Sequence, residues 1–207
     1  MKNTLVLTSL SALLISVAGA NAMEYRPFIG ATMGISVLDY SNEMDNAARA
    51  TAVDLPSDFF TFGIEGGTRF GGYNQIYNGG VSLNFDMSDS KRIYDTFSNT
   101  KEGKITTYAF SGTYDNYLRL SGDKTSRIDL VLDAGMGMMN YAIDAESYAD
   151  FYGDTKYSTM FAFKAGLDFE LTKSVTLSAQ ARLFVPTREH YAINTQYILG
   201  GAVKYMF

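Results

Sequence analysis

The sequence contains no cysteine and no tryptophan, and only three prolines and one histidine occur among its 207 residues. Without cysteine, neither a disulfide framework nor a thiolate metal site can form, so stability has to come from strand pairing and packing. The scarcity of proline suits long strands, because proline cannot donate a hydrogen bond to a strand ladder. Any aromatic girdle would have to consist of the 15 tyrosines and 14 phenylalanines.

Positive charge is also in short supply. The chain has 17 Lys and Arg residues against 22 Asp and Glu residues, which gives a formal net charge of −5 at pH 7. A protein that binds nucleic acid uses a surplus of cations to neutralise phosphates. We therefore expect no nucleic-acid partner.

Residues 1–22 have the composition of a signal peptide. Lys2 gives a basic start, a short apolar run interrupted by Ser and Thr follows, and Ala20-Asn-Ala22 supplies a cleavage site. The run is too short for a membrane anchor, which needs roughly 20 apolar residues. We expect residues 23–207 to form the mature domain, in which no later stretch is apolar enough to span a membrane as a helix.

Alternation of apolar with small or polar residues runs through the mature chain. The last segment shows it most clearly, because Tyr197, Leu199, Val203, Tyr205 and Phe207 share one face up to the final residue. This period of two is typical of a transmembrane β-strand with lipid on one side and a polar lumen on the other. Eight segments of about ten residues show this alternation: 27–37, 59–70, 76–87, 105–118, 127–141, 159–171, 175–184 and 191–207.

The links between these segments alternate in length. Short links at 71–75, 119–126 and 172–174 are interleaved with longer ones at 38–58, 88–104, 142–158 and, less markedly, 185–190. Outer-membrane barrels have this pattern of short periplasmic turns and longer extracellular loops. The sequence therefore predicts an all-β fold, an eight-stranded antiparallel up-and-down transmembrane β-barrel.

A soluble, lipocalin-like barrel would also be exported and alternating, but its apolar face would point inward. Here most of the strand glycines, such as Gly135 and Gly137, lie on the polar face, and the apolar face carries the aromatics. Small residues suit a lumen that side chains must fill, so the alternation favours the membrane barrel.

Two pieces of sequence resemble the small outer-membrane barrel family that includes opacity-type proteins and the OmpA-like barrel domain. Pro27-Phe-Ile-Gly-Ala-Thr-Met-Gly34 is similar to the first strand of that family, and Tyr205-Met-Phe207 is similar to its C-terminal signal. The resemblance implies the outer membrane of a Gram-negative bacterium, contact with lipid and lipopolysaccharide, and delivery by the barrel-assembly machinery, which would read Val203, Tyr205 and Phe207. Members serve as structural proteins, adhesins, narrow pores or immune-evasion factors.

Four inward charges are candidates for an interior ion network: Glu65, Asp133, Lys164 and Arg182. Counting back from the tight turn near Lys173 places Lys164 opposite Arg182 on neighbouring strands. Two such like charges need compensation in a narrow lumen, because an unpaired buried charge has a large desolvation cost. We predict that Glu65 and Asp133 supply it and that the four residues plug the lumen; a partial network around trapped water is the alternative.

No catalytic, cofactor-binding or metal-binding motif is recognisable. The sole histidine, His190, is followed two residues later by Ala192, whereas an outer-membrane lipid A deacylase would be expected to show His-x-Ser. Gly135-Met-Gly137 resembles part of a nucleotide-binding loop, but it lies within a strand and opens no helix. We therefore expect a non-enzymatic protein without cofactors, and an outer-membrane lipid-modifying enzyme is the least favoured interpretation.

Recognition, if there is any, should reside in the long loops, since binding residues concentrate on loops held by a rigid scaffold. Tyr148, Phe151 and Tyr152 form an aromatic group that could contact a host or surface protein, or could belong to an interfacial girdle. The favoured function is a structural or surface-interaction role of the adhesin or surface-antigen type. The alternative is a narrow, OmpW-like channel for small or apolar solutes.

Overall fold

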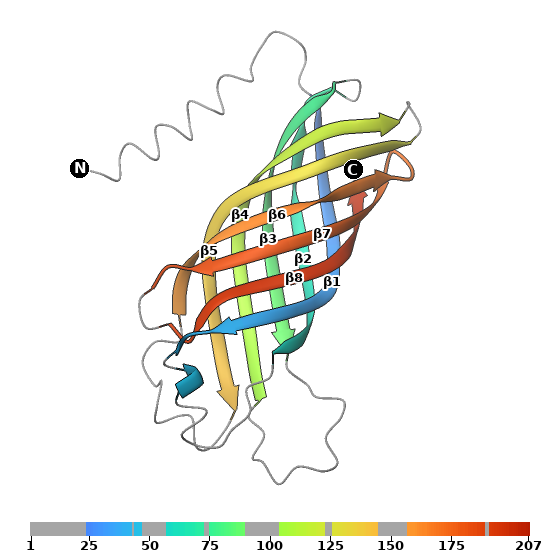
Figure 1. Cartoon of the computed structure of the whole chain (residues 1–207). Helices are drawn as coiled ribbons and strands as arrows, with labels where there is room; N and C mark the ends of the chain where they lie inside the picture. Colours follow the sequence, from blue (N-terminus) through green and yellow to red (C-terminus); the bar gives the residue numbers. More distant parts are fainter. Residues whose placement is uncertain are drawn as a thin grey trace, which may run out of the picture.

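The computed structural model describes residues 24–42, 44–46, 57–72, 75–89, 104–122, 126–144, 157–188 and 191–207. Within them the chain forms a closed barrel of eight strands, shown in Figure 1. The strands are β1 (Tyr25–Tyr40), β2 (Asp58–Phe70), β3 (Tyr77–Asp89), β4 (Lys104–Gly122), β5 (Arg127–Asp144), β6 (Tyr157–Glu170), β7 (Val175–Pro186) and β8 (Ile193–Met206).

Every strand pairs antiparallel with the next one, and β8 returns to pair with β1, so the sheet has no free edge. The closing register places Ile29 opposite Tyr205 and Leu38 opposite Gln196. Closure satisfies the backbone groups that an open edge would leave unpaired, which is a requirement for strands that cross a membrane. The predicted antiparallel eight-stranded barrel is confirmed. The predicted signal peptide, residues 1–22, lies outside the described residues.

The two ends of the barrel differ. We call the end with the short connections 71–76, 123–126 and 171–174 the turn end; it also holds the start of β1 and Phe207, and it lies at the top of Figure 1. The opposite end, which we call the loop end, carries the connections 41–57, 90–103, 145–156 and 187–192. Seven strands extend beyond a predicted limit, whereas β8 lies within the predicted range 191–207. β4 and β5 remain paired as far as Lys104 and Asp144.

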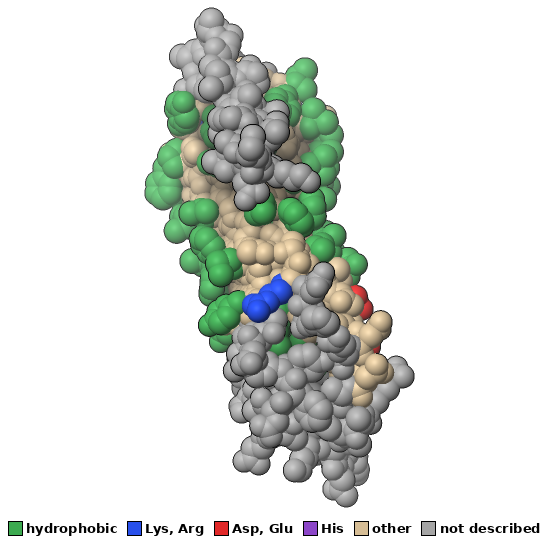
Figure 2. All heavy atoms as spheres, turned by 90° about the vertical axis from the view of Figure 1, so that its left-hand side faces the viewer, with side chains coloured by type: hydrophobic (Ala, Val, Ile, Leu, Met, Phe, Trp, Pro, Cys, Tyr) green, Lys and Arg blue, Asp and Glu red, His purple; other side chains and the backbone are tan. Residues whose placement is uncertain are grey.

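The outer wall is apolar. Large hydrophobic side chains stand out from every strand, among them Ile29, Phe62, Leu83, Met136 and Leu199, each more than half exposed. Figure 2 shows hydrophobic side chains along the barrel wall, with other side chains and backbone visible between them. The outward apolar face predicted from the alternation is therefore confirmed, and it excludes the lipocalin-like arrangement. None of the helices in the described ranges is long and apolar enough to cross a membrane.

The interior has two different halves. Toward the turn end and the middle it contains charged and polar side chains, as predicted. Toward the loop end it contains a cluster of buried apolar residues, which the prediction of small or polar inward residues missed. We call this group the loop-end cluster; it comprises Leu38, Tyr40, Met44, Phe59, Ile105, Ala109, Met139, Tyr141, Met160, Ala162, Phe184, Tyr191, Ala192, Ile193 and Ile198.

Gly135 and Gly137 of β5 lie where β5 approaches the backbone of β4 closely. A Cβ added at Gly135 would lie 2.0 Å from the carbonyl oxygen of Gly112, and one added at Gly137 would lie 2.0 Å from that of Phe110. Backbone atoms cannot give way as a flexible side chain would. This close approach accounts for the glycines that resemble part of a nucleotide-binding loop in the sequence.

We predict that Gly137→Ala destabilises the barrel by about 2 kcal/mol, because overpacking against backbone costs roughly this much. Gly112→Ala on the neighbouring strand is the matched control: its Cβ would meet only Leu83 Cδ2, at an ordinary 3.5 Å. The measurement is the urea midpoint of each variant, read from the gel shift between folded and unfolded forms. Equal midpoints for the two variants would contradict the close approach.

Candidate functional site

The centre of the barrel interior is organised around Glu65 of β2. Its Oε2 lies 3.6 Å from Lys164 Nζ and 3.5 Å from Arg182 Nη2, and its Oε1 lies 3.6 Å from Lys204 Nζ. The four side chains are nearly inaccessible to solvent. One carboxylate therefore links cations from three strands, β6, β7 and β8, across the lumen to β2.

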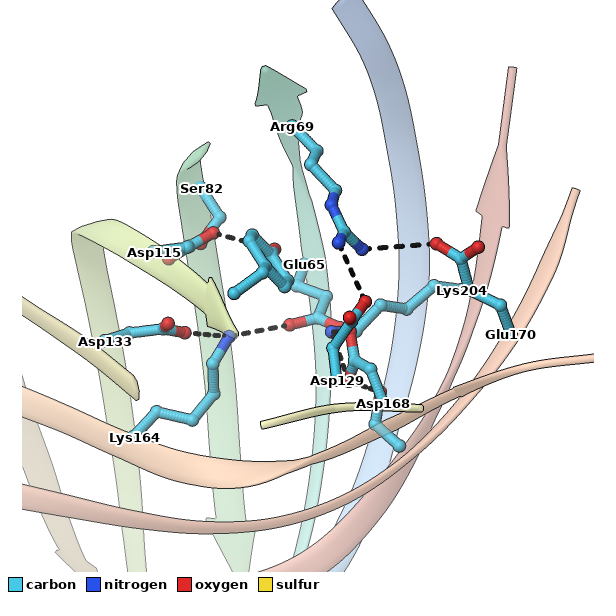
Figure 3. A network of polar contacts seen from close by, with 12 residues as sticks. Glu65, Arg69, Ser82, Asp115, Asp129, Asp133, Lys164, Asp168, Glu170 and Lys204 are labelled. Atoms are coloured by element: carbon cyan, nitrogen blue, oxygen red, sulfur yellow. Dashed lines mark hydrogen bonds and ion pairs between the residues drawn. The ribbon is translucent and has the colours of Figure 1, made fainter. Parts of the chain in front are cut away.

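Each of these cations also has a carboxylate of its own. Lys164 Nζ lies 2.5 Å from Asp133 Oδ2, Arg182 Nη1 lies 2.7 Å from Asp86 Oδ1, and Lys204 Nζ lies 3.0 Å from Asp168 Oδ2. Figure 3 shows Lys164 between Asp133 and Glu65, with the Lys204 side chain reaching toward Glu65 and Asp168. We call the seven residues the central network: Glu65, Asp86, Asp133, Lys164, Asp168, Arg182 and Lys204.

The four residues singled out from the sequence all lie in this network, and Lys164 faces Arg182 in the β6–β7 register. Sequence reasoning did not assign Lys204, Asp86 or Asp168 to the network. All three occupy inward positions of their strands, so the alternation carried the signal. The alternation does not show which residues of non-neighbouring strands lie at the same level along the barrel axis.

A second charged group fills the turn end. Arg69 Nη2 lies 2.7 Å from Asp129 Oδ2 and its Nη1 lies 3.2 Å from Glu170 Oε1, as Figure 3 shows. Arg26 also reaches Glu170, at 3.0 Å, and Arg127 reaches Asp129, at 2.6 Å. We call these five residues the turn-end network: Arg26, Arg69, Arg127, Asp129 and Glu170.

Neutral polar groups are hydrogen-bonded to one another beside the apolar half. Gln196 Nε2 donates to Ser88 Oγ at 2.8 Å and to Thr107 Oγ1 at 3.3 Å, and Ser88 shares a 2.7 Å hydrogen bond with Thr61. These side chains are fully or almost fully buried. Gln196 pairs in register with the cluster residue Phe184, and Phe184 lines a small cavity together with Lys164 and Arg182, so the charged and apolar halves adjoin directly.

The geometry of the two networks provides charge compensation. Charges in the two networks lie within ion-pair distance of opposite charges, so their desolvation is offset by mutual attraction. Among the residues that the structure describes, no group of three His, Cys, Asp or Glu side chains is placed to hold a metal ion.

The remaining candidates lie away from the lumen or outside the described residues. Val203, Tyr205 and Phe207 are exposed on the outer wall, with Tyr205 and Phe207 at the turn end, where their rings meet edge to face with centroids 5.3 Å apart. The Phe207 amide donates to Pro27 O at 2.9 Å, which fixes the end of the chain to β1. Tyr148, Phe151, Tyr152 and His190 fall outside the described residues.

Comparison with known proteins identifies the class. The model of the outer membrane protein β-barrel domain family matches residues 9–207, and the chain belongs to this family of small eight-stranded barrels. It is a protein of the bacterial outer membrane. In such barrels the short turns lie in the periplasm and the long loops outside the cell.

Solved structures share the fold at low sequence identity. Neisserial surface protein A, NspA, aligns with a TM-score of 0.54 and 9% identity over 90% of this chain and 100% of its own. Ail, the attachment invasion locus protein of Yersinia pestis, aligns at 0.45 and 14% over 87% and 99%. The N-terminal β-barrel domain of Pseudomonas aeruginosa OprF aligns at 0.43 and 12% over 87% and 97%. No curated protein matches this chain in sequence.

We predict that Glu65→Gln destabilises the barrel by about 3 kcal/mol, because it removes the charge that three buried cations share. Glu24→Gln is the matched control, since Glu24 is exposed just before β1. The temperature at which the folded band disappears from a heat-modifiable gel reports the difference. If both variants melt with the wild type, Glu65 is not the centre of the network.

Proposed function

We propose that this chain is a non-enzymatic outer-membrane protein whose closed barrel serves as a rigid scaffold for surface interaction through its long loops. The observation that carries the proposal is that two groups of side chains fill the barrel interior, which we call the two closures. The central network links β2, β6, β7 and β8 across the lumen, and the loop-end cluster fills the other half with apolar side chains.

A small cavity lies between the two closures. It is lined by Asn84, Lys164, Arg182 and Phe184 and has room for about one water molecule. A continuous water-filled path is what a porin needs. The packing therefore supports a plugged scaffold more than the OmpW-like channel for small or apolar solutes.

The charged residues also favour a non-enzymatic role. A general acid or base must be able to reach a substrate, whereas the acids of the central network are buried and already bound to cations. A lipid-modifying enzyme would need a histidine with a serine or carboxylate around one cleft.

Recognition is then assigned to the loop end. Tyr148, Phe151 and Tyr152 are the proposed contact residues for a host or surface protein, because aromatic side chains are enriched at protein interfaces. NspA, which shares the fold, is by name a surface protein, in keeping with such a role.

Export and assembly complete the proposal. Residues 1–22 would direct export, and the barrel-assembly machinery would read Val203, Tyr205 and Phe207, which the outer wall leaves accessible at the turn end. The exposed apolar band would contact membrane lipid and lipopolysaccharide.

Planar-bilayer recordings test the closed interior. We expect the wild type to show no steady conductance, and Arg182→Ala to remain silent but less heat-stable, because the loop-end cluster still closes the lumen. Combining Arg182→Ala with Met160→Ala and Phe184→Ala should produce discrete openings. A steady open state of the wild type would favour the channel, and unchanged heat stability and conductance in Arg182→Ala would rule out the plug.

Adhesion assays test the loops. Cells of a non-adherent Gram-negative host that express the protein should bind a cultured epithelial monolayer several-fold more than vector-bearing cells. Replacing Tyr148, Phe151 and Tyr152 by Ser should remove this gain, because it removes the aromatic contact area. An unboiled gel of the membrane fraction verifies that the variant is folded. Undiminished adhesion of the triple variant would assign binding elsewhere, and no gain in wild-type cells would contradict the adhesin role.

A further inference from the structure

The cavity where the charged and apolar halves adjoin has a mostly polar lining. Residues of β3, β4, β6 and β7 surround it, and it has room for about one water molecule. Its polar side chains are each at most 8% exposed; they belong to Asn84, Ser111, Thr113, Lys164 and Arg182. Polar groups buried this deeply require hydrogen-bond partners, so the bonds that each of them makes show what the cavity can hold.

The two cations of the lining have N–H groups that their carboxylates do not use. Arg182 Nη1 donates to both carboxylate oxygens of Asp86 at 2.7 Å, and Nη2 donates to Glu65 at 3.5 Å. Its buried Nε has no hydrogen-bond partner among the described residues. Lys164 Nζ, with three N–H donors, lies 2.5 Å from Asp133 Oδ2 and 3.6 Å from Glu65 Oε2 (Figure 3). Each cation therefore keeps at least one donor to spare.

Asn84 adds a group of the opposite kind. Its Nδ2 donates to Ser82 Oγ at 3.4 Å and to Thr113 Oγ1 at 3.5 Å. Its buried Oδ1 accepts no hydrogen bond from any described residue. Burying such an acceptor without a partner is unfavourable. The lining thus combines spare donors with a spare acceptor.

This combination matches water better than an ion. A water molecule accepts two hydrogen bonds and donates two, which suits two N–H donors, one amide oxygen and the nearby hydroxyl groups of Ser111 and Thr113. A metal cation would meet the positive charges of Lys164 and Arg182. An anion would approach the carboxylates that already pair with both of these cations, and like charges repel.

We propose that one buried water molecule is bound in this cavity, where it accepts hydrogen bonds from Lys164 and Arg182 and donates one to Asn84 Oδ1. Lys164 and Arg182 lie opposite each other in the β6–β7 register, so the water oxygen serves two neighbouring like charges at once. The ion network predicted from the sequence and the trapped water of its alternative then occur together. This inference goes beyond the scaffold role, because it assigns a bound molecule to the interior.

Crystals of the barrel, grown in parallel with chloride and with bromide, test the site directly. We expect one peak of electron density within hydrogen-bonding distance of Asn84, Lys164 and Arg182, with the strength of a water oxygen and without an anomalous signal from bromide. Asn84→Leu, which has a similar shape but no acceptor, should lose the peak.

The stability of variants at Ala162, which also lines the cavity, gives a second measurement. Ala162→Thr and Ala162→Val add side chains of nearly the same shape, and only threonine brings a hydroxyl. The folded band of Ala162→Val should disappear about 5 °C below that of Ala162→Thr on a heat-modifiable gel, because valine displaces water without replacing its hydrogen bonds. Ala109 is the matched control: it is buried in the loop-end cluster and is not one of the residues that line this cavity. There the valine variant should be at least as stable as the threonine variant.

Three results would overturn the proposal. An anomalous bromide signal in the cavity would make it an anion site. A wild-type map without a peak, or a peak that persists in Asn84→Leu, would refute the bound water or its stated partner. Equal melting of Ala162→Thr and Ala162→Val would show that the cavity is a dry packing gap.

Discussion

The ion pairs of Glu65 are the constraint on which the interior depends. The barrel wall is held by hydrogen bonds between neighbouring strands, but such bonds cannot link strands on opposite sides of the lumen. Glu65 provides that link, since its carboxylate lies within 3.6 Å of cations on β6, β7 and β8. These charged side chains are almost inaccessible to solvent, so water cannot readily replace Glu65, and its loss would remove the one anion that the three cations share.

The sequence predicted the wall well and the interior only partly. Period-two alternation marks which residues of a strand face outward, and it located the eight strands, the inward position of Glu65 and the pairing of Lys164 with Arg182. It gives no relative height for strands that are not adjacent. Asp86, which lies 2.7 Å from Arg182 across the lumen, was therefore not identified as its partner.

The loop-end cluster was missed for a different reason. Near the loop end, consecutive apolar residues replace the alternation, as in Val37-Leu38, Phe59-Phe60 and Met138-Met139. One residue of each pair faces outward and the other is buried inside the barrel. If every apolar residue of a strand is assigned to lipid, the buried residue of each pair looks like an irregularity. Such doublets at corresponding ends of several strands are the signal of an apolar interior.

The two halves of the interior place opposite demands on the protein. The central network requires each charge at its place, because a buried ion pair tolerates no missing partner. The loop-end cluster requires only apolar side chains of about the right volume, which cores accept in many combinations. The two halves adjoin at Ala162 and Phe184, which line a small cavity together with Lys164 and Arg182. The fold thus places its least replaceable side chains near the middle and the turn end, and its more replaceable ones toward the loops.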